Sequence, residues 1–294
     1  MSETSGPHNP SKSFLALTKD NRSGVWTTIG GGVLIFVIWQ LALVLVTLYV
    51  PVVQTVVLGG KSVSPGEEAV GIGFLLVGGF GPAFIVMMLW RRMMERRRVL
   101  TLFTAVGRFR WSLAVVSAVV VGAMGLGLTV AFDPESVALM QDRLTRLSPS
   151  DWLMLTIAYG IGISVQATFE EAYVRGWLLQ HISRFIPNAM AAIVTTALIF
   201  SALHYGHPGW ATYVAALTFG LAYGWSAWRL NGLEAAIGAH VANNLIGALL
   251  TGQMVSGNPP TMDGADFALY AAYVLGFLLF VEVWARLVEK PSRA

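Results

Sequence analysis

Apolar residues occur along this chain in long, nearly continuous runs, not in the short alternating pattern of half-buried strands. Several runs are long enough to cross a hydrocarbon layer, and loops rich in proline and glycine separate them. The fourth run is too long for one straight crossing, so we expect it to tilt, kink or protrude. The pattern predicts an all-α polytopic membrane protein with eight helices in one bundle, over residues 24–50, 68–90, 111–132, 152–180, 188–206, 211–228, 232–251 and 266–286.

The composition supports this interpretation. Of the 294 residues, 55% are hydrophobic and only 12% are charged, about half the charged fraction of a soluble protein. The net charge of +3 could suggest a nucleic-acid partner. Most lysines and arginines, however, stand in short loops beside the apolar runs, so membrane topology explains them better and we expect no nucleic acid. Cysteine is absent, which excludes disulfides, cysteine nucleophiles and thiolate metal sites.

The beginning of the chain differs from the rest. Residues 1–23 are polar and contain Pro7 and Pro10, which predicts a flexible tail on the cytoplasmic side. The apolar run that begins near Gly24 is too long for the core of a signal peptide, so we expect a retained first span. The remaining residues, 24–290, are then predicted to form one transmembrane domain.

Basic residues gather on one side of the predicted topology. The opposite loops contain only Lys61, Arg143 and Arg146. By the positive-inside rule we expect both termini of this multi-pass protein in the cytoplasm. We further expect a bacterial cell membrane as its location, with lipid as its surroundings. The basic residues on the predicted inner side are Lys12, Lys19, Arg22, Arg91, Arg92, Arg96, Arg97, Arg98, Arg108, Arg110, Arg184, Arg229, Arg286, Lys290 and Arg293.

Two adjacent carboxylates and a guanidinium interrupt the fourth run. Glu170, Glu171 and Arg175 lie where an ionised group costs about 2.5–3.5 kcal/mol or more, so they need a reason to be there. Adjacent helical positions point about 100° apart, whereas residues one turn apart share a face. We therefore expect Glu171 to pair with Arg175 and Glu170 to face a cavity as a general base or acid. A purely structural ion network is the alternative.

Polar partners for Glu170 follow downstream. His204 lies as far after the turn at Pro187 as Glu170 lies before it, so an antiparallel helix pair with equal arms would bring the two to one depth. His240 and Asn244 lie one turn apart and could together donate hydrogen bonds to a developing oxyanion. Polar contacts that only hold helices together are the alternative.

Other polar residues are weaker candidates. Asn243 points away from the face of Asn244 on an ideal helix, and His181 is predicted to be a surface residue. The Arg91–Arg98 cluster could attract anionic lipid headgroups, although we favour a plain topology signal.

Three motifs now stand in order: Glu170-Glu171-x-x-x-Arg175, Phe200-x-x-x-His204 and His240-x-x-x-Asn244. Together, over about residues 150–250, they resemble the intramembrane CAAX-processing and bacteriocin-processing endopeptidase family (the CPBP or ABI family). The resemblance implies a bundle of eight helices with a cavity open to the membrane and the cytoplasmic side. It also implies hydrolysis of a peptide bond in a membrane-associated peptide, or in a hydrophobic or prenylated protein.

The same resemblance implies roles for the motif residues. Glu170 would deprotonate water with help from His204, while His240 and Asn244 would stabilise the tetrahedral oxyanion. Glu171 and Arg175 would support this geometry. Val174 stands where the family usually has an aromatic residue, which is a departure that concerns substrate packing.

Other mechanisms and functions remain open. Glu170, His204 and His240 could hold zinc, but the chain has no His-Glu-x-x-His helix, so we favour a mechanism without metal or other cofactor. A proton- or ion-coupled transporter would also need intramembrane Glu, Arg and His. A non-catalytic immunity protein that binds a peptide is the third possibility.

Overall fold

The computed structural model describes residues 13–19, 24–59, 63–205, 209–252 and 264–287. Within these ranges the chain is all-α, and its strand-like pairing is confined to one isolated bridge between Thr104 and Gly232. The α-helices are α1 (Val25–Tyr49), α2 (Pro51–Leu58), α3 (Pro65–Met93), α4 (Trp111–Phe132), α5 (Pro134–Arg146), α6 (Pro149–Glu171), α7 (Leu179–Phe185), α8 (Ala189–Ala202), α9 (Trp210–Arg229), α10 (Glu234–Ile246) and α11 (Gly264–Leu287). Short turns add η1 (Phe14–Ala16), η2 (Val99–Leu102) and two π-helical segments, η3 (Ala172–Leu178) and η4 (Gly247–Thr251).

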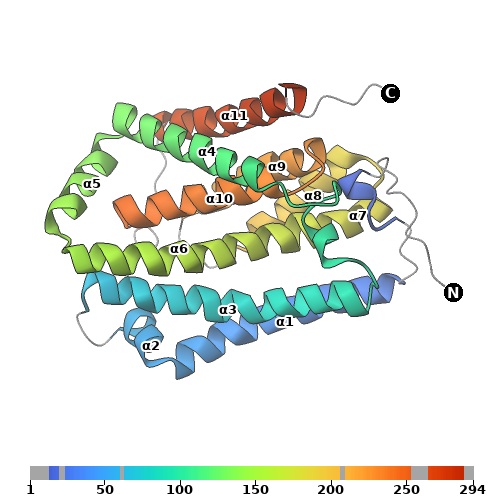
Figure 1. The fold of residues 1–294 in the computed structure, drawn as a ribbon, viewed down its shortest axis with the longest axis horizontal. Helices are drawn as coiled ribbons and strands as arrows, with labels where there is room; N and C mark the ends of the chain where they lie inside the picture. The colour runs from blue at the N-terminus through green and yellow to red at the C-terminus, as the bar shows by residue number, and fades with distance from the viewer. Residues whose placement is uncertain (1–12, 20–23, 60–62, 206–208, 253–263, 288–294) are drawn as a thin grey trace.

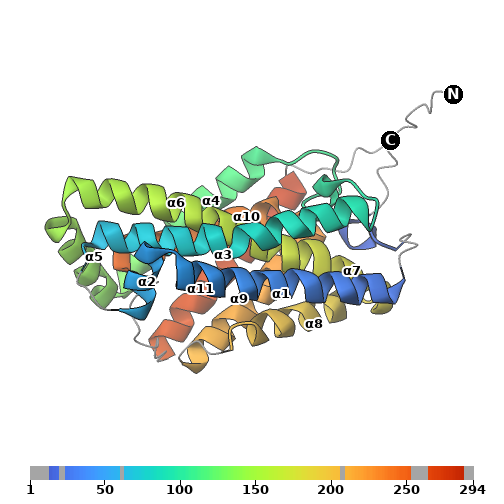
Figure 2. The same cartoon turned by 90° about the horizontal axis from the view of Figure 1, so that it is seen from below.

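The helices form one elongated bundle (Figures 1 and 2). Helix α3 packs between α1 and α6, and α8 packs along α9. Helix α10 packs against α4, α6 and α9, and α11 covers α4 and α9. Helices α6 and α10, which are in contact with each other, carry most of the polar residues that the sequence singles out.

Two long helices begin with the same N-terminal capping arrangement. Ser64 caps α3 and Ser148 caps α6, each in a reciprocal capping box, and a proline follows at the first helical position. The Asp151 carboxylate of the second box also accepts a hydrogen bond from the Gly66 backbone N–H at 3.0 Å. This bond ties the starts of α3 and α6 together, so the two helices run side by side from the same end.

Small residues permit the close approach of neighbouring helices. A Cβ on Gly162 of α6 would lie 3.1 Å from the Gly73 Cα of α3, which is tighter than ordinary contact. On α10, a Cβ on Gly238 would collide with the Ala114 carbonyl oxygen of α4. The second position therefore requires glycine, and it sets how close the helix that bears His240 lies to α4.

All eight predicted spans coincide with helices. In the described part of the chain, 5 helical segments are long and apolar enough to cross a membrane. They are Val25–Tyr49, Pro65–Met93, Trp111–Phe132, Phe267–Leu287 and the continuous run Pro149–Phe185, which is 37 residues long. Many large apolar side chains on these segments are exposed, as lipid contact requires. The all-α membrane class is thus confirmed, whereas the count of eight crossings stays a prediction.

Two helices were not foreseen. The chain turns through α2 and α5 where the sequence suggested plain loops. Both begin with a proline at the first helical position, and α5 has an Asp133 cap whose carboxylate accepts from the Ser136 N–H at 2.9 Å. The loop signal at Asp133-Pro134 was recognised, but here the proline begins a helix.

The segment 13–19 is docked on the bundle, so the expectation of a flexible tail is wrong for these residues. Phe14 and Leu15 are buried against residues of α7, α8 and α9. The Phe14 N–H donates to Asn231 Oδ1 at 3.0 Å, and Ser183 Oγ donates to the Leu15 carbonyl at 2.6 Å. Residues 1–12 and 20–23, together with Lys61, Lys290 and Arg293, lie outside the described residues.

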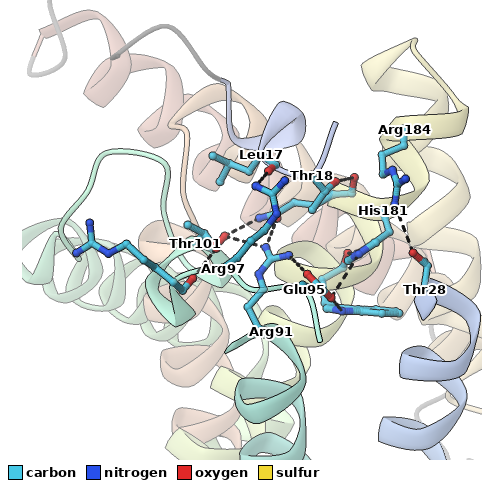
Figure 3. Close-up of polar contacts among 12 residues, drawn as sticks. Leu17, Thr18, Thr28, Arg91, Glu95, Arg97, Thr101, His181 and Arg184 are labelled. Carbon is cyan, nitrogen blue, oxygen red and sulfur yellow. Dashed lines mark hydrogen bonds and ion pairs between the residues drawn. The ribbon is translucent and has the colours of Figure 1, made fainter. Parts of the chain in front are cut away.

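A buried polar cluster lies beside this segment (Figure 3). We call its members, which are Arg91, Glu95, Trp177, Gln180 and His181, the anchoring network. Glu95 Oε2 accepts from Arg91 Nη1 at 2.5 Å, and its Oε1 accepts from Trp177 Nε1 at 2.8 Å and lies 3.5 Å from His181 Nε2. The prediction that His181 is a surface residue is wrong: the residue is 1% exposed.

The anchoring network joins three parts of the chain. Gln180 Oε1 accepts from Arg91 Nη2, and Gln180 Nε2 donates to the Thr101 carbonyl at 2.8 Å. Thr18 Oγ1 donates to the Gln180 carbonyl at 2.6 Å, and Arg97 Nη1 donates to the Leu17 carbonyl. The end of α3, the start of α7 and the segment 13–19 are therefore held together through side chains, not through backbone pairing (Figure 3).

Candidate active site

The candidate site begins where α6 changes its winding. Helix α6 ends at Glu171, and the chain continues without a break through the π-helical turn Ala172–Leu178 into α7. Single π-turns inside long helices are rare and occur frequently at functional sites. The change falls immediately after the two glutamates, so Glu170 lies in the last α-helical turn and Arg175 in the π-turn.

Glu171 has two cationic or potentially cationic neighbours. Arg175 Nη1 donates to Glu171 Oε1 at 3.0 Å, which is the ion pair expected from their spacing. His240 Nδ1 lies 2.8 Å from the same oxygen. The Arg175 guanidinium also lies 4.3 Å from the centre of the Phe200 ring and 5.6 Å from that of Tyr223, within reach of cation–π attraction. Both side chains of the ion pair are almost completely buried.

Glu170 occupies the other side of His240. Its Oε1 accepts a hydrogen bond from Gln166 Nε2 at 2.6 Å, and its Oε2 lies 3.8 Å from His240 Nε2. The second distance is too long for a hydrogen bond but allows charge attraction when the imidazole is protonated. The imidazole of His240 therefore lies between the two glutamates, with one nitrogen toward each. Glu170 thus has the Gln166 amide and the His240 ring as neighbours, whereas the ion pair of Arg175 in these contacts is with Glu171.

Asn244 joins the same cluster through a residue that sequence interpretation missed. Asn244 Nδ2 donates to Gln166 Oε1 at 3.2 Å, and Asn243 Nδ2 donates to Asn244 Oδ1 at 3.0 Å. Gln166 stands one turn before Glu170 and was not among the predicted site residues. The sequence did offer a signal for Gln166: it is an amide inside an apolar helix, and it lies four residues before Glu170, a spacing that puts both side chains on one face. Asn243, expected to be the weaker candidate, contacts Asn244 directly.

We call this cluster the site network. It comprises two carboxylates, one guanidinium, one imidazole and two amides, contributed by α6, η3 and α10. Glu171 Oε2 and Arg175 Nη2 are buried and have no hydrogen-bond partner among the described residues, which leaves polar capacity inside the cluster. The members are Gln166, Glu170, Glu171, Arg175, His240 and Asn244.

His204 lies at the edge of the site network, just after the end of α8. Its Nδ1 lies 2.9 Å from the Phe200 carbonyl, and its ring meets the Phe200 ring edge-on at 4.8 Å between centres. Because Nδ1 donates to a carbonyl, Nε2 is the nitrogen that can accept a proton in the neutral ring. His204 is thereby connected to Arg175 through Phe200, whose ring lies beneath the guanidinium.

The residues named for zinc do not form a ligand set in this geometry. Glu170 and His240 approach each other, but the described part of the chain contains no group of three or more His, Cys, Asp or Glu side chains placed to hold a metal ion. Two surface hollows lie elsewhere, between α4 and α5 and between α1 and α3, and neither is lined by a predicted site residue.

Comparison with known proteins finds a family match to this region. Residues 149–246 match the family described as type II CAAX prenyl endopeptidase Rce1-like. A relative, the uncharacterized protein YyaK of Bacillus subtilis (strain 168), is 29% identical over 108 residues, which is 35% of this chain and 36% of that protein. No solved structure matches. The matched segment runs from the start of α6 to the end of α10 and thus contains every predicted site residue. The resemblance to the CAAX-processing and bacteriocin-processing endopeptidases is confirmed for residues 149–246, which match the Rce1-like family model.

Proposed function

We propose that the chain is an intramembrane peptidase in which Glu170 activates water to hydrolyse a peptide bond of a membrane-associated substrate. The observation that carries this proposal is the geometry around Glu170. One carboxylate oxygen is held by Gln166, and the other faces His240 Nε2 at 3.8 Å with no hydrogen bond between them. A buried carboxylate with one oxygen left beside an imidazole suits proton transfer to and from a reacting water.

The steps of the reaction follow from the positions of these groups. Glu170 Oε2 removes a proton from water while the oxygen of that water bonds to the carbonyl carbon of the substrate. The tetrahedral oxyanion receives hydrogen bonds from His240 Nε2–H and from the Asn244 amide. The C–N bond then breaks, and the proton held by Glu170 passes to the leaving amine, which regenerates the carboxylate.

Donation from His240 Nε2 in this scheme requires a ring that is protonated on both nitrogens, because Nδ1 already donates to Glu171. Glu170 and Glu171 lie on either side of such a ring. Arg175 keeps Glu171 in place and prevents it from competing for the water. His204 supports Glu170 from the end of α8, as the family resemblance implies.

The substrate class follows from the family description and from the membrane setting. Rce1-like proteins are described as CAAX prenyl endopeptidases, and both glutamates of the candidate site lie in the helical run Pro149–Phe185, which is apolar enough to cross a membrane. We propose a peptide or protein that carries its own lipid or apolar segment, presented to the site from the bilayer. We also propose that both termini lie in the cytoplasm, as the distribution of basic residues indicates.

The test compares wild type with Glu170→Gln, which preserves shape and removes the base. We expect cleavage of an internally quenched farnesylated CAAX peptide in phospholipid vesicles to fall by about 10²–10⁴-fold, while unfolding in detergent is little changed. Comparing the carboxy-terminal peptides of cells that express either form would identify natural substrates. Cleavage by Glu170→Gln at the wild-type rate would contradict the base role, and uptake driven by a pH gradient without any cleavage would favour a transporter.

A chelation experiment addresses the alternative ligand set. Because Glu170, His204 and His240 do not form a metal-binding group in the described structure, we expect orthophenanthroline to leave cleavage by the purified protein unchanged. Loss of activity that added zinc restores would contradict this expectation and would require His204 to move toward Glu170.

A further inference from the structure

Gln166 is a buried amide in a helix whose other buried side chains are mostly apolar. It lies within α6, one turn before Glu170, and is 8% exposed. An amide removed from water costs free energy unless both of its ends find partners. Both ends do: Nε2 donates to Glu170 Oε1 at 2.6 Å, and Oε1 accepts from Asn244 Nδ2 at 3.2 Å. The side chain is therefore a bridge between α6 and α10.

The direction of this bridge follows from chemistry. An ionised carboxylate only accepts hydrogen bonds, so the NH₂ group of Gln166 must face Glu170 and its carbonyl oxygen must face Asn244. Asn244 in turn must present its own NH₂ group to Gln166. Its carbonyl oxygen then points away and accepts from Asn243 Nδ2 at 3.0 Å. Three amides thus form a chain with a single polarity that ends on the carboxylate of Glu170.

This polarity determines which atoms remain for a substrate. With Oε1 held by Gln166, Oε2 is the oxygen of Glu170 that faces His240. With one N–H of Asn244 on Gln166, the other N–H of the same NH₂ group is the one left to donate to an oxyanion. One side chain therefore orients both the base and the amide donor, although it has no role of its own in bond making.

We infer that Gln166 is the positioning residue of the proposed peptidase, holding the Glu170 carboxylate and the Asn244 amide in register across α6 and α10. The inference rests on the proposed function. It assigns to Gln166 a part that is distinct from structural support, because its loss should disturb two reacting groups at once and leave substrate binding largely intact.

The test uses two variants of Gln166 and one matched control. Gln166→Met keeps the unbranched length of the side chain and removes both hydrogen bonds. Gln166→Asn keeps the amide but is one methylene too short to bridge both partners. The control is Gln180→Met, which removes a second buried glutamine of the same helical run, whose side chain bonds to Arg91 and to the Thr101 carbonyl. Each variant is assayed in vesicles with the quenched farnesylated CAAX peptide, with folded protein quantified by size-exclusion chromatography in detergent.

We expect Gln166→Met to lower kcat by about 100-fold with little change in KM, because displacing reacting groups by about 1 Å has effects of this size. Gln166→Asn should fall between wild type and Gln166→Met. Gln180→Met should lose folded protein but keep kcat per folded molecule. In an Asn244→Ala background, Gln166→Met should cost less than it does in wild type, because one of the two groups it positions is already gone.

Two outcomes would overturn the inference, and they differ from failure of the proposed function. A kcat of Gln166→Met or Gln166→Asn equal to wild type would remove the positioning role while the peptidase stands. Equal losses in the wild-type and Asn244→Ala backgrounds would show that Gln166 only supports the fold. If folded wild type cleaves neither this peptide nor any cellular protein, the proposed function itself fails, and the role of Gln166 fails with it.

Discussion

The site network and the anchoring network are built from nearly the same parts. Each contains an Arg–Glu pair one turn apart, a histidine beside the carboxylate and a buried glutamine, and each includes residues of the run from α6 to α7. In the anchoring network, the two oxygens of Glu95 accept hydrogen bonds from Arg91 and Trp177. In the site network, a second carboxylate is present, and Glu170 keeps one oxygen without a hydrogen bond in these contacts.

The comparison shows that buried charge alone does not distinguish the proposed catalytic group from a structural one. Both networks contain charges that would be costly in lipid without partners, and both meet this cost by pairing. What separates them is whether a carboxylate oxygen remains available to a small molecule after the pairing is complete. The adjacent glutamates make this possible, because Arg175 pairs with Glu171 while Glu170 stays outside the ion pair.

The largest expected difference in kcat is between variants of Glu95, in the anchoring network, and of Glu170, in the site network. Glu95→Gln should leave kcat per folded molecule unchanged, whereas Glu170→Gln should lower it by about 10²–10⁴-fold. The same Glu95→Gln change leaves Arg91 without its counter-charge and should destabilise the fold by about 3–5 kcal/mol. Vesicle cleavage assays and unfolding in sodium dodecyl sulfate measure the two effects. Similar losses of kcat in both variants would erase the distinction between the networks.

The arginines should behave alike in both networks. Arg175→Met and Arg91→Met each leave a buried glutamate unpaired, and we expect each to lower the free energy of unfolding by about 3–5 kcal/mol. Arg175→Lys and Arg91→Lys retain the charge but lose the planar fork, so they should cost less. Unfolding titrations of the four variants provide the measurement. An Arg175→Met protein as stable as wild type would show that Glu171 does not depend on its ion pair.

A smaller loss of stability is expected for a variant of Phe200, whose ring contacts Arg175 of the site network. Phe200→Leu removes the ring beneath Arg175 and the edge contact with His204, and should cost about 1–2 kcal/mol of stability. Because the same change frees two side chains of the proposed site, kcat should also fall. The control Phe84→Leu alters a ring that contacts Phe103 and Phe169 but neither Arg175 nor His204 in the described contacts, so it should change stability without changing kcat. Parallel behaviour of the two variants would argue against a role for Phe200 in the site.

The smallest effect tests how the anchoring network holds the segment 13–19. Thr18→Val keeps the shape and removes the hydroxyl that donates to the Gln180 carbonyl, at an expected cost of about 1 kcal/mol. The control Thr156→Val removes a bond that stays within one turn of α6 and is exposed, so its effect should be smaller. Thermal unfolding in detergent compares the two variants. Equal melting temperatures for Thr18→Val and Thr156→Val would indicate that this contact contributes nothing to docking.

Features set by local helix geometry were predictable from the sequence. The positions of the long helices follow from the apolar runs, and the Glu171–Arg175 pair follows from a spacing of one turn. The polar cluster at the contact of α6 and α10 was also foreseen in part, because a buried His and Asn one turn apart need partners on another helix. The placement of His240 between both glutamates could not be derived, since it depends on how α10 packs against α4 and α6.

Features set by long-range packing were missed. His181 and Arg91 looked like surface and loop residues, yet each is buried by chain segments that are distant in sequence. Gln166 was overlooked because a single glutamine in an apolar helix carries little information until its partners are known. The segment 13–19 looked like part of a polar tail, and only its contacts with α7, α8 and α9 reveal that Phe14 and Leu15 belong to the core.

The docking of residues 13–19 has a practical consequence for anyone who expresses this protein. A shortened gene that starts at Gly24 would be an obvious choice for crystallisation, since it removes the polar leader and keeps every long helix. It would also remove Phe14 and Leu15, which pack in the apolar core, together with the Phe14 N–H and the Thr18 hydroxyl. Asn231 Oδ1 and the Gln180 carbonyl would then lose the groups that donate to them. Affinity tags are therefore better added ahead of the intact leader than in place of it.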